Sequence, residues 1–347
     1  MLDSRQRAAA FMDCHLLVSD LFWPASAGDE PYSELALPAL ETLLARGRRL
    51  KTPGASLERA LAAQYGLPDA LPLAPFSLRG DGGEPGADWW LRADPVHLRV
   101  HRDQLVLADA SRLDVKPEEA RDCVAALNSH FGSDAISFIA PHPDRWYART
   151  ANEPRLRTTP TSEAAGRGVG ALLPQGADGA RWRRVINEAQ MLLHEHPCNQ
   201  AREQQGQPAI NSIWIWGPGR GRELAASFDA VWADDPVAIG LAAASGGNAR
   251  PLPVSGAALL ETRHTGTHFV VVKQPATAYG DLKEWRDAVE DLERSWTAAL
   301  VAGLWDGALD SLTLHGLGPD YGYTSVLTRR DRLRVWRTRR PLRAYAA

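Results

Sequence analysis

The chain has 347 residues, with 39 Lys and Arg against 42 Asp and Glu, and a formal net charge of −3. At roughly 150 residues per domain, this length predicts about two domains, or one large domain with an insertion. A hydrophobic content of 44% and a charged content of 23% are typical of a globular protein with a buried core, which excludes disordered, collagen-like and coiled-coil chains. No apolar run approaches the ~20 residues that span a bilayer, and no long apolar stretch follows the charged N-terminus. We therefore expect a cytoplasmic protein without a signal peptide or a membrane partner.

The cysteines agree with that expectation. Cys14, Cys123 and Cys198 are odd in number, far apart in the sequence and not part of a CxxC pair. This pattern predicts neither a disulfide framework nor a Cys-rich zinc site. Isolated cysteines are most often small buried hydrophobic residues.

Short apolar runs that indicate buried strands alternate along the chain with amphipathic patterns that indicate helices. Pro38 opens the first helix and Gly47 follows its end. In the last helix Trp285, Val289 and Leu292 repeat at helical spacing. In chain order we predict a strand at 15–18, helices at 38–46 and 117–131, a strand at 135–140, a helix at 181–196, a strand at 212–216, a helix from 236, a strand at 268–273, a helix at 285–300 and a strand at 311–315.

This alternation predicts an α/β fold, in which helices cover both faces of a mainly parallel sheet. Residues 79–88 are rich in Gly, Asp and Pro and are expected to form a flexible boundary, whereas 158–179 are expected to form a loop. We predict a discontinuous core domain made of residues 1–87 and 206–347. Residues 88–205 would then form an inserted α/β domain.

The most distinctive segment runs from His194 to the strand at 212–216. It places His196, Asn199, Arg202 and Asn211 on a loop that leads into the strand. The guanidinium and the two amides could hold an anion. Residue chemistry alone favours the alternative that these side chains cap the preceding helix and tie the loop down. His194 and His196 are only two positions apart, which makes them poor zinc partners on a helix.

The pattern HPxNxxRxxxGxPAxN at 196–211, followed by an apolar strand and a GPG turn, resembles the archaeal-type branch of the cofactor-independent phosphoglycerate mutases. Those enzymes belong to the alkaline-phosphatase-like superfamily, and the chain is most similar to its bacterial RpfE-type regulatory proteins. Residues 16–21, 37–43, 114–128 and 144–147 also resemble family segments, so the likeness covers roughly residues 11 to 320. It implies an alkaline-phosphatase-like core with an inserted domain.

The resemblance also implies a two-metal phosphotransferase site, in which a serine takes the phosphoryl group while divalent ions hold the oxygens. Asp20 stands where the family has its first metal ligand, at the carboxyl end of a strand. Ser56 stands at the position of the nucleophile, but Leu57 replaces the usual acidic neighbour.

Other family ligands are missing. Ala276 and Gly280 occupy positions where the family has Asp and His, and His315 is followed by Gly316 rather than forming an Asp-His pair. A catalytic ion normally needs at least three protein ligands, so we predict that the metal centre is degraded. Manganese or zinc is expected only if other residues rebuild the site. The available candidates are Asp13, Asp229, Asp234, Asp235, Asp320, His264 and His268.

The C-terminus carries a run of arginines between Arg329 and Arg343, interleaved with Leu333, Val335 and Trp336. This alternation predicts a final edge strand with its arginines facing water, where positive charge discourages aggregation. The alternative is a surface that binds nucleic acid or an acidic protein. The negative charge of the whole chain disfavours nucleic acid.

Three functional hypotheses follow. The first is a degenerate, non-catalytic mutase-like protein with a regulatory role, which binds a phosphorylated small molecule or a protein partner. Its predicted ligand-binding residues are Arg145, His196, Asn199, Arg202 and Asn211. The second is an active metal-dependent mutase or phosphohydrolase with Ser56 as nucleophile and Asp20 and His315 as metal ligands. The third is a nucleic-acid or protein-binding module that uses the arginine-rich C-terminus.

Overall fold

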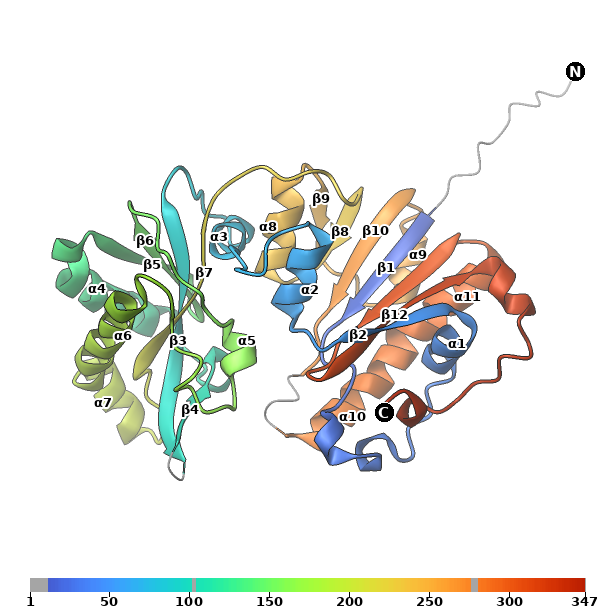
Figure 1. Ribbon diagram of the computed structural model, residues 1–347, viewed down its shortest axis with the longest axis horizontal. Coiled ribbons are helices and arrows are strands. Elements are labelled where there is room, and N and C mark those ends of the chain that lie inside the picture. The colour runs from blue at the N-terminus through green and yellow to red at the C-terminus, as the bar shows by residue number, and fades with distance from the viewer. Residues whose placement is uncertain (1–11, 102–103, 276–279, 347) are drawn as a thin grey trace, which may run out of the picture. The chain divides into compact units, whose positions relative to one another are not determined.

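The computed structural model describes residues 12–101, 104–275 and 280–346 and divides them into two compact units (Figure 1). The first unit consists of the chain up to Leu57, Ala226–Asp235 and the chain from Gly246 onward. The second consists of Glu58–Ala225 and Pro236–Ser245. No helix in the described residues is long and apolar enough to cross a bilayer.

The first unit is built on a seven-stranded sheet. Its strand order is β2-β12-β11-β1-β10-β8-β9, in which β11, β1, β10, β8 and β9 are parallel and β12 and β2 pair antiparallel at one edge. The predicted α/β class with a mainly parallel sheet is confirmed here. The bounds are β1 Met12–Val18, β2 Arg48–Pro53, β8 Ala230–Trp232, β9 Asn248–Arg250, β10 Gly266–Val272, β11 Ser311–Gly316 and β12 Tyr321–Thr328.

One face of this sheet carries the core of the first unit. Because side chains alternate along a strand, Cys14, Leu16 and Val18 of β1 all point into it and are fully buried. Helices α1 (Pro38–Arg46), α9 (Gly256–Glu261), α10 (Leu282–Leu292) and α11 (Ala298–Asp306) also contribute buried side chains to this core. The predicted helix at 285–300 is α10 and α11 joined without a break by a π-helical turn at Glu293–Thr297.

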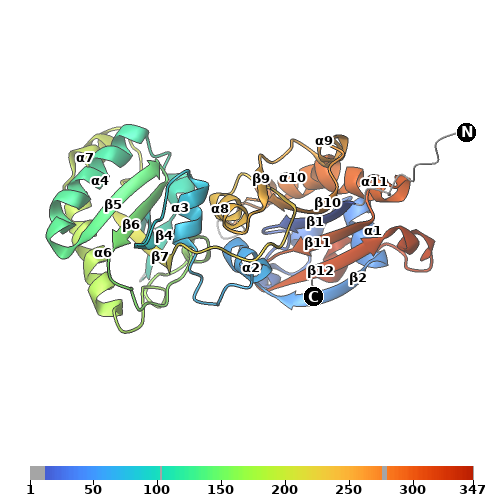
Figure 2. The ribbon, with the colours of Figure 1, turned by 90° about the horizontal axis from the view of Figure 1, so that it is seen from above.

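The second unit contains an antiparallel sheet in the order β4-β3-β6-β5, with β7 paired to β3. Its core lies between this sheet and helices α4 and α6, which lie on the same side of the sheet (Figure 2). The predicted parallel arrangement therefore does not extend to the strand at 212–216. The bounds are β3 Trp89–His101, β4 Gln104–Ala108, β5 Ile136–His142, β6 Arg145–Thr150, β7 Ser212–Arg220, α2 Leu57–Gln64, α3 Ala74–Gly80, α4 Pro117–Phe131, α5 Thr161–Ala164, α6 Gly179–His194, α7 Pro197–Gln204 and α8 Pro236–Ala244.

The units divide at different positions from the predicted domains. The break lies at 57/58 and 225/226 rather than at 87/88 and 205/206, and α8 joins the second unit. Packing explains the shift, because α3 packs closely against α8 and β7 pairs with β3 along much of its length. Residues 79–88 thus lie inside the second unit and include the end of α3.

The predicted C-terminal edge strand is wrong. β12 ends at Thr328, and the chain then forms a 3₁₀ turn at Arg329–Leu333 and a second at Leu342–Tyr345. The Asp331 carboxylate accepts hydrogen bonds from the Thr328 amide at 2.9 Å and from its hydroxyl at 3.0 Å, and this cap turns the chain out of the strand. The edge strand on this side of the sheet is β2, which carries Arg48 and Arg49.

Candidate functional site

The carboxyl ends of the parallel strands in the first unit are where α/β folds place their sites. Asp20 is the second residue after the end of β1 and has a φ of 48°, in the left-handed region that Asp tolerates better than most residues. The Trp285 indole donates a hydrogen bond to the Asp20 carbonyl at 2.8 Å. The backbone at Asp20 is therefore held in a sharp turn at this edge of the sheet.

Hydrogen bonds join the loops that follow neighbouring strands. The Gln274 amide, after β10, donates to the buried Ser19 hydroxyl at 3.0 Å, and the Phe22 amide donates to the Leu317 carbonyl at 3.0 Å. The Ala55 amide donates to Gly318 at 3.1 Å. The structure thus brings the segments that carry Asp20 and Ser56 to the same loop after β11.

His315 lies on β11 beside Leu17 of β1, one residue before the strand ends. Its Nε2 atom is 3.2 Å from Nδ1 of His15, and its Nδ1 atom is 3.4 Å from the Thr324 hydroxyl. Burial, and then the nearby His15, lower the pKa of His315 to about 4. The imidazole is therefore neutral at pH 7 and pairs with a second imidazole rather than with a carboxylate. Sequence analysis missed His15, although the alternation of a strand assigns it to the same sheet face as His315.

The five residues predicted to bind a ligand all lie in the second unit. Asn199 is buried, and its amide bonds Leu193 and both backbone groups of Ile210 at 2.7–2.9 Å. The Asn211 amide likewise bonds both backbone groups of Leu98. These contacts agree with the alternative interpretation of the sequence, in which the Asn199 and Asn211 side chains hold the loop in place.

Arg202 and His196 are also engaged by protein groups. The Arg202 guanidinium donates to the Glu119 carboxylate at 2.7 Å, to the Pro208 carbonyl at 2.8 Å and to the Leu113 carbonyl. His196 caps α7, where its Nδ1 atom accepts the Cys198 amide at 3.3 Å. A ligand-binding role for these residues stays a prediction, and a ligand would have to compete with these partners.

Arg145 pairs with two carboxylates. Its Nε atom donates to Asp81 at 2.9 Å, and its NH1 atom donates to Asp144 at 3.1 Å. The Tyr147 hydroxyl also donates to Asp81, which joins this pair to the buried side chains of the second unit. The charge of Arg145 is therefore balanced locally.

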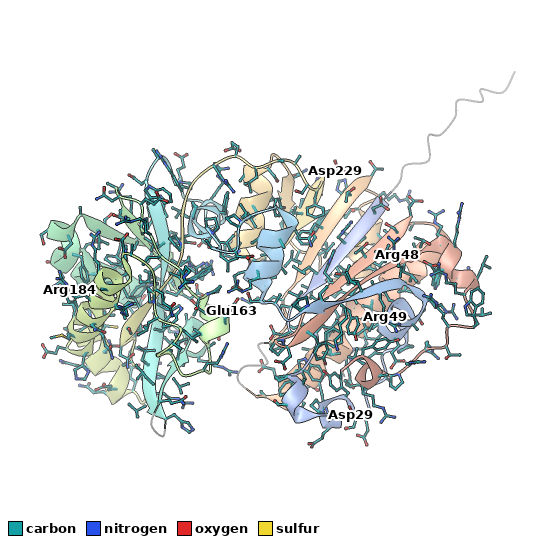
Figure 3. All side chains as sticks on the ribbon, in the orientation of Figure 1. Asp29, Arg48, Arg49, Glu163, Arg184 and Asp229 are labelled. Carbon is teal, nitrogen blue, oxygen red and sulfur yellow. The ribbon has the colours of Figure 1, made fainter. Side chains whose placement is uncertain are left out.

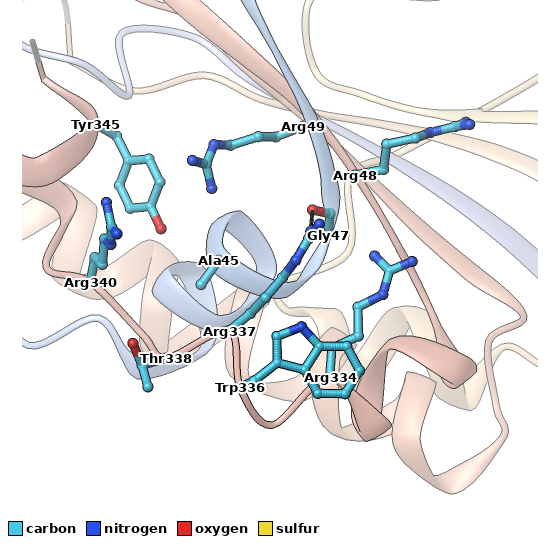
Figure 4. A pocket seen from close by; sticks show the side chains of 10 residues that line it. All are labelled: Ala45, Gly47, Arg48, Arg49, Arg334, Trp336, Arg337, Thr338, Arg340 and Tyr345. Carbon is cyan, nitrogen blue, oxygen red and sulfur yellow. Dashed lines mark hydrogen bonds between the residues drawn. The ribbon is translucent and has the colours of Figure 1, made fainter.

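A cavity of about 680 Å³ opens in the first unit where α1 ends, β2 begins and the C-terminal segment passes (Figure 4). Among the described residues, no carboxylate belongs to its lining. The lining residues, which we call the arginine pocket, are Ala45, Gly47, Arg48, Arg49, Arg334, Trp336, Arg337, Thr338, Arg340 and Tyr345.

Three of the pocket arginines are anchored by the end of α1. Arg49, Arg334 and Arg337 donate to the carbonyls of Leu44, Arg46 and Gly47 at 3.0, 3.2 and 3.1 Å. These carbonyls have no partner inside the helix, and they attract positive charge. These bonds hold the guanidinium groups of Arg49, Arg334 and Arg337 around the end of α1 and the start of the exposed strand β2 (Figure 4).

The charge of the pocket is poorly balanced. Of its five arginines, Arg334 pairs with the Asp331 carboxylate at 2.9 Å, and Arg49 lies 5.1 Å from the ring centre of Tyr345. The Tyr345 hydroxyl is buried and has no hydrogen-bond partner among the described residues. Figure 4 shows Arg49 and Arg340 on either side of this ring. The pocket therefore presents positive charge and one unused hydroxyl to a bound molecule.

No protein-family model matches the chain. A probable 2,3-bisphosphoglycerate-independent phosphoglycerate mutase of Geobacter sulfurreducens is 28% identical over 154 residues, which make up 44% of this chain and 39% of that protein. The corresponding mutase of Methanosarcina mazei is 26% identical over 195 residues, 52% of this chain and 48% of the relative. The chain is similar to cofactor-independent phosphoglycerate mutases. It spans less than half the length of these curated relatives.

Among solved structures, the chain is similar to the PH0037 protein from Pyrococcus horikoshii. The TM-score is 0.58 at 15% sequence identity, and the match covers 92% of this chain and 88% of that protein. At this level of identity the likeness shows a shared fold.

A mutase-like two-metal centre would need several Asp and His ligands near Asp20. Among the residues that the structure describes, the one group of three or more His, Cys, Asp or Glu side chains close enough to share an ion lies in the second unit. The candidates for a rebuilt site are dispersed. Asp13 and Asp229 lie at the amino ends of the strands, where they accept hydrogen bonds from Ser311 and Thr267. Asp320 accepts the Ala25 amide at 2.8 Å.

The remaining candidates also have structural partners. Asp234 accepts the Leu252 amide at 3.1 Å. His268 is fully buried and bonds the Trp232 indole at 3.0 Å, while its ring lies near that of His264. Asp235 precedes Pro236 at the start of α8, the capping position that the sequence indicates.

Proposed function

We propose that this mutase-like protein binds a phosphorylated small molecule in the arginine pocket and does not transfer phosphoryl groups through a two-metal centre. A regulatory role would agree with the sequence resemblance to RpfE-type proteins. The observation that carries the proposal is the set of five arginines around one cavity, whose lining includes no carboxylate among the described residues.

Phosphate chemistry suits this pocket. A phosphomonoester carries a charge of about −1.5 to −2 near pH 7 and three strong acceptor oxygens. Guanidinium groups bind such oxygens in pairs, which adds geometric specificity to charge. The Tyr345 hydroxyl, which has no partner among the described residues, supplies a further donor.

The sequence at the metal-ligand positions that the resemblance implies supports the non-catalytic part of the proposal. Asp20 matches the first ligand that the resemblance implies, but in the sequence Leu57, Ala276 and Gly280 replace an acid, a ligand carboxylate and a ligand histidine. Ala276 lies outside the residues that the structure describes. One carboxylate cannot hold two ions in a fixed geometry, because each needs about three protein ligands. The imidazole of His315 is engaged by His15.

Calorimetric titration with inorganic phosphate, at low ionic strength, tests the pocket. We expect R49Q/R340Q to weaken phosphate binding at least about 10-fold, because two charged donors are removed. Y345F should weaken binding by a smaller factor. The matched control is R184Q, which removes one exposed charge on α6 in the second unit (Figure 3). Equal affinity in R49Q/R340Q and R184Q would exclude the arginine pocket as the site.

The catalytic alternative is tested separately with 3-phosphoglycerate and Mn²⁺. We expect no turnover by the parent protein. Turnover that S56A abolishes would overturn the non-catalytic proposal and establish Ser56 as the nucleophile.

A further inference from the structure

Two cysteines and one histidine meet in the second unit, whereas the arginine pocket and Asp20 belong to the first. The side chains are Cys123, His196 and Cys198, and their ligand atoms all lie within 4.8 Å of one another. Cys123 is fully buried, whereas His196 and Cys198 are half-buried. The group therefore has one side in the core and one side open toward solvent.

Local structure explains how distant residues converge. Cys123 lies on the inward face of α4, between Ala120 and Leu127 of the core. Cys198 is in the first turn of α7, and Pro197 starts that helix. Residues two apart on a helix point in different directions, but His196 is the extended N-cap, with φ −68° and ψ 134°. Its ring therefore turns back toward Cys198.

The donor set is that of a zinc site. Two thiolates and one imidazole occur among the ligands of tetrahedral zinc, with a fourth position taken by water or another group. A metal ion at this site would compete with the 3.3 Å hydrogen bond from the Cys198 amide to His196 Nδ1 and with the hydrogen bond between the Cys123 and Cys198 thiols. We propose that Cys123, His196 and Cys198 bind one zinc ion, with the fourth position open to water.

Metal binding at this site must displace the protons of both thiols. Burial raises the pKa of both thiols, and the nearby Glu119 carboxylate raises both further. Without a cation, thiolates are disfavoured here. A Zn²⁺ ion bound to two thiolates is electrically neutral, so it can replace the two thiol protons without adding net charge to the buried group. Such an ion would join α4 to the start of α7.

Cobalt uptake by the reduced full-length chain tests the site. We expect one Co²⁺ per chain, a sulfur-to-cobalt charge-transfer absorption and displacement of the cobalt by Zn²⁺. C198S and H196Q should each weaken cobalt binding by about 100-fold or more, since loss of even an outer partner costs 10–100-fold. The matched control is C14S, which alters a fully buried cysteine of the first unit.

Thermal unfolding provides a second readout. Zn²⁺ should raise the Tm of the parent protein and of C14S but not that of C198S, whose half-buried side chain allows the variant to fold. The proposal is overturned if the reduced parent takes up no cobalt, or if C198S and H196Q bind it as tightly as C14S does. These results are independent of phosphate binding in the first unit.

Discussion

Arg202 donates to the Glu119 carboxylate and to two carbonyls, and its side chain is 1% exposed. The sequence places this arginine in a polar loop, where it could either bind an anion or hold the loop in place. Its structural partners occupy the guanidinium, because a buried charge must be paired. Arg145, paired with Asp81, shows the same outcome.

Loss of Arg202 should therefore cost stability. R202M leaves Glu119 and two carbonyls without their partner, and we expect the free energy of unfolding to fall by about 3 kcal/mol. R184M alters an arginine whose side chain is 71% exposed, and it should change the free energy of unfolding by less than about 0.5 kcal/mol. Urea denaturation of both variants checks this, and equal effects would contradict the structural role of Arg202.

The two facing histidines predict a pH dependence. The pKa of His315 is lowered from 6.5 to about 4 by burial and then by His15. Burial also lowers the pKa of His15, against a smaller raising effect of Asp13. Because the unfolded chain binds these protons more readily, the folded state should lose stability as the pH falls from about 6.5 toward 4.

For His315 alone the loss should be roughly 2 kcal/mol, somewhat below what the pKa difference implies, because the imidazole is partly exposed. Urea unfolding of the parent protein and of H315Q at pH 7 and pH 4.5 measures this loss of stability. H315Q should show the smaller loss at low pH. An identical pH dependence in both proteins would rule out a lowered pKa at His315.

At the scale of elements, α1 shows how a predicted helix can depend on a distant residue. Pro38 and Gly47 indicate its ends, yet Leu37 at the N-cap has no capping side chain. The carboxylate of Glu293 accepts the Ala39 and Leu40 amides at 2.7 and 3.0 Å instead. Glu293 begins the π-helical turn between α10 and α11, so these helices hold the start of α1.

E293A should lower the free energy of unfolding by about 2 kcal/mol, because two amides at the start of α1 lose a charged acceptor. E290A, one turn earlier and half-exposed, is the control and should have little effect. Thermal and urea unfolding measure both. A cost for E293A no larger than that for E290A would mean that Glu293 does not stabilise α1.

At the scale of the whole molecule, charge is distributed unevenly. The chain as a whole carries −3, a value that disfavours a polyanion partner. Five arginines nevertheless gather at one cavity of the first unit. Two of them come from β2 and three from the C-terminal segment, which Leu342 and Tyr345 anchor in the core. The net charge is a sum over the whole chain and therefore does not reveal a local cluster of positive charge.

The sequence by itself determined those strands and helices whose formation depends on residues close together in the chain. The strands at 15–18, 268–273 and 311–315 and the helices at 38–46 and 117–131 match the structure closely, because periodicity, proline and glycine act within a few residues. The resemblance carried by residues 196–211 pointed to mutases, and the comparisons found such relatives. Asp20 also lies where the sequence predicted, at the carboxyl end of β1.

Only the tertiary structure decided which distant side chains meet. It paired β7 with β3, ended β12 at Thr328 with the Asp331 cap, and placed Arg48 and Arg49 beside the C-terminal arginines. It also brought Cys123 to His196 and Cys198, although their sequence spacing predicts no metal site. Such contacts depend on how separate elements pack, and local patterns carry no information about partners that lie far away along the chain.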